Sequence, residues 1–134
     1  MNHQTAPITR VVIAHTLISA LHGLAHLLIP VPISVLQALF IAGVISALQI
    51  VAVLLVWRQQ VKWASTVLLV SMAGSLLFGL YNHFVVISPD HFFQMPPTSL
   101  GVLFQVTAVL LTVSEGIGIG VSVWALNPRQ PLSP

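Results

Sequence analysis

The stretch LQALFIAGVISALQIVAVLLVW, Leu36 to Trp57, contains no charged residue and no proline. A helix needs about 20 predominantly apolar residues to cross the hydrocarbon core of a bilayer. The stretch meets this length without interruption, and polar residues follow it directly. It is therefore predicted to be a membrane-spanning helix, and the rest of the chain can be compared with it.

The composition of the whole chain agrees with a membrane protein. Of its 134 residues, 57% are hydrophobic and only 4% are charged, against about 25% charged residues in soluble domains. The net charge of +2 comes from four basic and two acidic residues, too few to form the basic surface that nucleic-acid binding requires. The chain has no cysteine, which excludes disulfides and thiolate metal sites.

Three further segments have the length and composition of membrane spans. The four predicted helices cover residues 9–29, 34–57, 63–86 and 99–126, approximately. Proline cannot continue a helix interior, and prolines 30, 32, 89, 96, 97 and 128 all lie at these boundaries. The predicted fold class is all-α: an integral membrane four-helix bundle that forms one transmembrane domain over residues 1–134.

The basic residues predict the orientation of the bundle. Arg10, Arg58, Lys62 and Arg129 all fall on the same side of a four-helix topology, and the positive-inside rule assigns that side to the cytoplasm. Both termini are then cytoplasmic. The predicted location is multi-pass in the inner (cytoplasmic) membrane, with the lipid bilayer as the main partner. Association as a homodimer or within a larger membrane complex stays open.

Three histidines lie on one stripe of the first predicted helix. His15, His22 and His26 are separated by seven and four residues, so their directions fall within about 40° at 100° per residue. Polar groups that face lipid are costly, so the stripe is expected to face the bundle interior. Hydrogen bonding to a neighbouring helix is one interpretation of these side chains, and metal binding is the other.

Depth in the membrane favours a site made by two helices. His22 and His26 are one turn apart near the outer end of the first helix, and His83 is expected at a similar depth in the third. Neutral imidazoles suit zinc, copper or iron, and histidines from two helices can also ligate a haem such as haem b. We predict a transition-metal or haem site at these residues.

The outer loop adds polar groups to this predicted site. His91 lies in the connection after the third helix and is predicted as a fourth metal ligand. Asp90 beside it and Asn82 before His83 are expected to support the site as polar neighbours. The connection is long enough to fold over the end of the bundle.

Glu115 is the one carboxylate inside the predicted spans. Ionisable residues at such positions are functional candidates by default, and Glu115 could pair with His15 as a proton relay or as a contact for a quinone head group. The alternative is a neutral Glu115 that hydrogen-bonds a backbone carbonyl or one of Ser46, Ser71 and Ser75.

Small residues in the fourth predicted helix form two overlapping patterns. Gly116 and Gly120 make a G-x-x-x-G pair, and Gly118 and Ser122 repeat the same spacing two residues further along. Such pairs let helices approach closely. Plain helix packing is the favoured interpretation of both.

Four short stretches in the second half of the chain resemble a known family. They are His83-Phe84, Pro89-Asp90-His91-Phe92, Pro96-Pro97 and Glu115-Gly116. With four predicted helices, they look like the broad DoxX-like group of bacterial membrane proteins. The resemblance implies a cytoplasmic-membrane protein that in some members is tied to quinone-linked redox chemistry.

Three functional hypotheses follow from these residues. The first is a metal- or haem-binding protein with a redox or metal-handling role. The second is a quinone-linked or proton-relay accessory subunit, and the third is a purely structural membrane subunit. A hydrolase is disfavoured because no serine has an evident base and orienting acid beside it, and any other enzymatic activity stays open.

Overall fold

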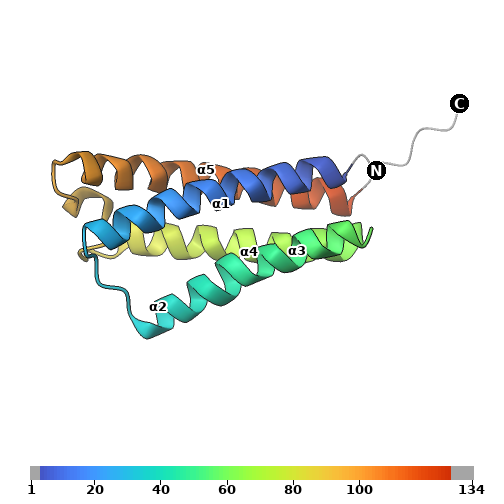
Figure 1. Cartoon of the computed structure of the whole chain (residues 1–134), viewed down its shortest axis with the longest axis horizontal. Coiled ribbons are helices and arrows are strands. Elements are labelled where there is room, and N and C mark those ends of the chain that lie inside the picture. Colours follow the sequence, from blue (N-terminus) through green and yellow to red (C-terminus); the bar gives the residue numbers. More distant parts are fainter. Residues whose placement is uncertain (1–3, 128–134) are drawn as a thin grey trace, which may run out of the picture.

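The computed structural model describes residues 4–127, and within that range every regular element is a helix (Figure 1). The first span is α1, Thr5–Leu28, and the last is α5, Ser99–Leu126. The second span runs through α2 (Val35–Phe40), η1 (Ile41–Ala47) and α3 (Leu48–Trp57). The third joins α4 (Val61–Leu80) to η2 (Tyr81–Val85), and the short η3 (Phe92–Gln94) precedes α5.

Each of the four spans is long and apolar enough to cross a membrane. The predicted all-α chain with four such helices is therefore confirmed. Large apolar side chains such as Leu17, Leu77 and Val102 are exposed on the outside of the bundle, as expected for surfaces that contact lipid. The side of the membrane that each end occupies and the kind of membrane stay predictions.

The helix boundaries agree with the prediction except at the start of α1. This helix begins at Thr5 rather than near residue 9, so Pro7 lies inside its first turn. Proline is tolerated there because the first N–H groups of a helix have no intrahelical partner to lose. Pro128 and Arg129 lie outside the described residues.

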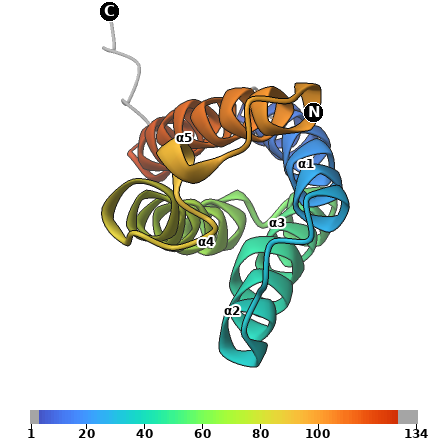
Figure 2. The ribbon, with the colours of Figure 1, turned by 90° about the vertical axis from the view of Figure 1, so that its left-hand side faces the viewer.

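The helices form a ring that is incomplete on one side. α5 packs along α1 on one side and along α4 on the other, and α3 packs on α4. Figure 2 shows α2 standing apart from α1, so the second span leans away from the bundle at this end. α1 begins and α5 ends at the same end of the bundle (Figure 1).

Two glycines allow the close approaches that hold this arrangement. A Cβ atom at Gly118 would lie 2.7 Å from the Met72 Cγ, at the contact of α5 with α4. A Cβ atom at Gly101 would lie 1.9 Å from the Pro96 carbonyl oxygen, where the loop meets the start of α5. Both positions need a residue without a side chain, and at Gly101 the obstacle is backbone.

Two π-helical segments interrupt the regular spans. η1 lies in the second span, where the Ser71 hydroxyl of α4 donates to the Val44 carbonyl at 2.7 Å. η2 ends the third span and carries His83. Wide turns of this kind occur often at functional sites, and both segments border the region described next.

Candidate metal centre

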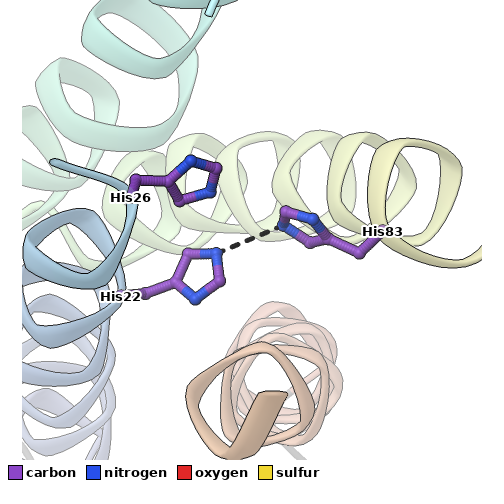
Figure 3. Close-up of side chains that lie close together, drawn as sticks. All are labelled: His22, His26 and His83. Atoms are coloured by element: carbon purple, nitrogen blue, oxygen red, sulfur yellow. Dashed lines mark hydrogen bonds between the residues drawn. The ribbon is translucent and has the colours of Figure 1, made fainter. Parts of the chain in front are cut away.

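The imidazoles of His22, His26 and His83 converge at one end of the bundle (Figure 3). α1 supplies two of them, because residues four apart share a helix face, and η2 supplies the third. One ring nitrogen from each side chain lies within 4.8 Å of the other two. The predicted histidine cluster across two helices is therefore confirmed.

The hydroxyl of Thr107 indicates which nitrogen of His22 carries the proton. It donates to the Leu103 carbonyl at 2.7 Å, so towards His22 Nδ1, at 2.9 Å, it acts as the acceptor. A neutral imidazole has one N–H and one acceptor nitrogen. His22 therefore directs the lone pair of its Nε2 into the cluster.

In His83 the same ring nitrogen, Nδ1, carries the proton, and its partners come from the loop. Its Nδ1 lies 3.1 Å from the Asp90 backbone carbonyl and 3.3 Å from the Asp90 Oδ1. Both are acceptors, so Nδ1 carries the proton and a neutral His83 also directs a lone pair inward from Nε2. The two Nε2 atoms of His22 and His83 face each other at 3.3 Å. Two lone pairs at this distance require a shared cation, which is either a proton or a metal ion.

His26 turns its Nε2 towards His22 and His83, and its Nδ1 points away from them (Figure 3). The Nε2 also lies 3.2 Å from the Asp90 Oδ1. The oxygen is out of line with either imidazole N–H, so the contact is electrostatic rather than an aligned hydrogen bond. The Nδ1 of His26 is buried and has no hydrogen-bond partner among residues 4–127. An unsatisfied buried polar atom is costly and calls for an explanation.

An aromatic ring supports all three imidazoles from α5. The centroid of the fully buried Phe104 ring lies 4.6 Å from that of His22, 4.9 Å from that of His26 and 5.2 Å from that of His83. Phe104 belongs to an apolar cluster that includes Met95 from the loop. The cluster fixes the ring positions and excludes water from this side.

The other side of the histidine group borders a cavity of about 830 Å³. His22, His26 and His83 line one part of it, and Glu115 lines another. A cavity beside three converging nitrogens gives any bound ion an open coordination position. Such positions are typical of catalytic or exchange sites, whereas structural sites are closed by protein ligands.

His15 and Glu115 do not hydrogen-bond each other as predicted, because each of them bonds serine hydroxyls instead. His15 Nδ1 lies 3.1 Å from the Ser114 hydroxyl, and its Nε2 lies 3.2 Å from the Ser19 hydroxyl. Glu115 instead accepts a hydrogen bond from Ser75 of α4. Both ionisable side chains are buried and held by serines, which corresponds to the hydrogen-bonded alternative for Glu115.

His91 lies outside the converging group. Its Nδ1 accepts a hydrogen bond from the Phe93 backbone N–H at 3.3 Å, which caps η3. Asp90 contacts both His26 and His83. Asn82 accepts a hydrogen bond from Gln37 of α2 at 2.9 Å and so ties the second span to the segment that carries His83.

Sequence reasoning missed Thr107 and Phe104. Neither has a distinctive spacing, because threonine and phenylalanine recur along every apolar helix. Their roles depend on which face α5 turns towards α1. No family model matches the chain, and no match was found among curated proteins or solved structures.

Proposed function

We propose that the chain is a multi-pass membrane protein that binds a divalent transition-metal ion through His22, His26 and His83. One observation carries the proposal: His22, His26 and His83 each bring one ring nitrogen within 4.8 Å of the other two, and the outer nitrogens of His22 and His83 lie beside oxygen acceptors. Acceptors behind metal-ligating histidines are the usual way in which proteins fix the tautomer and orient the ring.

A metal ion accounts for more of the geometry than a shared proton does. Two nitrogens bound at about 2.0–2.1 Å to one tetrahedral ion lie about 3.3–3.4 Å apart, and the separation of His22 Nε2 and His83 Nε2 is 3.3 Å. A proton between them would satisfy this pair alone. It would leave the His26 imidazole outside the pair, whereas an ion can bind one nitrogen from each of the three histidines.

The spacing supports a bare ion over a haem. Two axial nitrogens in line across one iron, each at about 2 Å, would be roughly 4 Å apart with the macrocycle between them. The His26 and Phe104 rings stand 4.8 and 4.6 Å from the His22 ring, in the space that the macrocycle would need. The observed side chains leave room for an ion and a small ligand.

The donor set favours zinc, copper(II) or iron(II). Imidazole is the common ligand of all three, and without thiolates the site lacks the donors that select copper(I) or iron–sulfur clusters. The nearby Asp90 carboxylate offsets part of the ion's charge. Metal handling or metal-assisted chemistry both fit such a site with an open position.

The location of the site supports an outward-facing role. His22 and His26 lie near the end of α1. The start of α1, which carries Arg10, and the connection from α3 to α4, which carries Arg58, lie at the opposite end of the bundle, as does Lys62 in the first turn of α4 (Figure 1). With the basic end in the cytoplasm, the site opens into the outer half of the membrane.

Elemental analysis of the purified protein tests the proposal. Protein extracted in a mild detergent from cells grown with zinc, copper and iron is expected to hold about one equivalent of one of these metals. His22→Ala and His83→Ala should each lose it. His91→Ala is the matched control, because it removes a histidine from the adjacent loop that is not in the group, and it should keep the metal.

Two results would overturn the proposal. The first is a folded wild-type protein that takes up no zinc, copper or iron even after incubation with each ion. The second is a Soret band in the optical spectrum of the wild-type protein that disappears in His83→Ala, which would assign the histidines to haem. Circular dichroism of every variant checks that loss of metal is not loss of helix.

A further inference from the structure

The cavity extends well beyond the metal ligands and has a second polar centre at Glu115. Its walls are formed by α1, the second span, α4 and α5, and most of the lining is apolar, including Leu27, Ile45, Phe78 and Leu111. A volume of about 830 Å³ lies within the roughly 300–1,000 Å³ of ligand pockets. A single metal ion held by the three histidines would occupy only a small part of this volume.

Glu115 has hydrogen-bonding capacity that the protein does not use. It is 3% exposed, and in the part of the chain that the structure describes its hydrogen-bond partner is the Ser75 hydroxyl on Oε1. No lysine or arginine is among the described residues that line the cavity. A carboxyl group held at membrane depth without a counter-charge is neutral by preference. It then offers both a donor and an acceptor to a ligand.

The cavity is open on the side where lipid would lie. Ala20 and Gly23 of α1 and Ser46 of η1 line it and are exposed. Figure 2 shows the second span diverging from α1 at this end. A Cβ atom at Gly23 would meet no atom within 4 Å, so no side chain obstructs the cavity at this position. A molecule dissolved in the bilayer would enter between these helices without crossing the polar loop.

We infer that this cavity binds a small neutral amphiphile from the lipid phase, with its apolar body against α1 and η1 and a hydroxyl or carbonyl head on Glu115. Among the described residues no lysine or arginine lines the cavity near Glu115, which disfavours an anionic head group there. The apolar lining disfavours a strongly hydrated one. Glu115, Ser75 and Gly23 are not metal ligands, so this site does not depend on the proposed ion.

Photolabelling with 4-hydroxybenzophenone tests the inference, because this probe combines an apolar body with hydroxyl and carbonyl groups. The protein is reconstituted in phosphatidylcholine nanodiscs, labelled over a range of probe concentrations and mapped by peptide mass spectrometry. Saturable labelling of peptides from α1 and η1 is expected.

A matched pair of glycine variants locates the binding. Gly23→Phe places a ring in the cavity, whereas Gly120→Phe places the same ring on α5 at a position that does not line it. A Cβ atom at either glycine meets nothing within 4 Å, so both variants should fold. Gly23→Phe should reduce saturable labelling at least tenfold, and Gly120→Phe should leave it within twofold of the wild type.

Glu115 variants test the head-group contact. Glu115→Leu should weaken the apparent affinity about tenfold, while Glu115→Gln, which keeps a donor and an acceptor, should stay within threefold. His83→Ala separates the two proposals, because it should lose metal and keep labelling.

Non-saturable labelling, or equal labelling of the wild type and Gly23→Phe, would overturn the ligand site. In that case bulk acyl chains alone fill the cavity.

Discussion

Asp90 is the residue whose removal best tests the metal centre without touching a ligand. Its Oδ1 lies 3.2 Å from His26 Nε2 and 3.3 Å from His83 Nδ1, so one carboxylate oxygen contacts both rings. Asp90→Ala deletes both contacts and leaves all three imidazoles in place. We expect weaker metal binding with an unchanged helix content.

The size of the loss can be worked out from the two contacts. Removing a polar neighbour that supports a metal ligand costs about 10- to 100-fold in affinity. His83 keeps the Asp90 backbone carbonyl at 3.1 Å, which the substitution does not remove, so His26 bears most of the loss. One such factor is therefore expected rather than the product of two. This is about 10- to 100-fold, or about 1.4–2.8 kcal/mol of binding free energy.

Asp90→Asn distinguishes charge from hydrogen bonding in the same experiment. Because Oδ1 is out of line with both N–H groups, the carboxylate acts on the imidazoles mainly through its charge. The amide keeps the shape but not the charge, and it should therefore lose nearly as much affinity as Asp90→Ala.

Competition with a chromogenic zinc chelator measures these affinities on detergent-purified protein. His91→Ala, one residue away in the same loop, should bind zinc within twofold of the wild type. If Asp90→Ala also binds within twofold, the carboxylate does not support the ligands and the argument from the loop fails.

Three further substitutions have defined expectations. Thr107→Val removes the acceptor for His22 Nδ1 at nearly constant shape, and it should weaken zinc binding about tenfold in the same competition assay; an unchanged affinity would contradict the inferred tautomer. Gly118→Ala puts a Cβ atom 2.7 Å from the Met72 Cγ and should destabilise the bundle by about 1–3 kcal/mol, whereas Gly120→Ala meets nothing and should be neutral or stabilising by up to about 1 kcal/mol. Thermal unfolding followed by circular dichroism in detergent compares the two, and equal melting temperatures would refute the packing argument.

The spans were predictable because the physics that defines them is local. Length, hydropathy and proline position decide where a membrane helix runs, and these are properties of consecutive residues. The convergence of His22, His26 and His83 also followed from local quantities: one turn of spacing in the first helix, and similar depth in the third. Depth is counted from the helix ends, so it needs no knowledge of which helices touch.

Contacts between faces could not be predicted from the sequence. The pairs Gly116–Gly120 and Gly118–Ser122 have the same spacing, yet only Gly118 and Ser122 are buried. The choice depends on the rotation of α5 against α4, which Met72 determines from another helix. The π-helical turn that carries His83 is likewise invisible to a count of 100° per residue.

The rotation of α5 also explains why His15 and Glu115 do not pair, although the sequence places them at similar depth. These side chains were matched by depth alone, but successive residues on α5 point in different directions. Ser114 is turned towards α1 and meets His15, whereas Glu115 is turned towards α4 and meets Ser75.

The way in which buried ionisable groups are satisfied separates structural positions from functional ones. His15 has hydroxyl partners for both ring nitrogens, so its requirements are met within the bundle and nothing more need bind there. The cluster differs, because oxygen atoms satisfy the outer nitrogens of His22 and His83 and leave their inner lone pairs facing each other. His26 brings a third ring nitrogen within 4.8 Å of the other two. A bundle selected for packing alone would gain by replacing such a group with apolar side chains. The facing lone pairs are therefore the feature of the cluster that the proposed ion would satisfy.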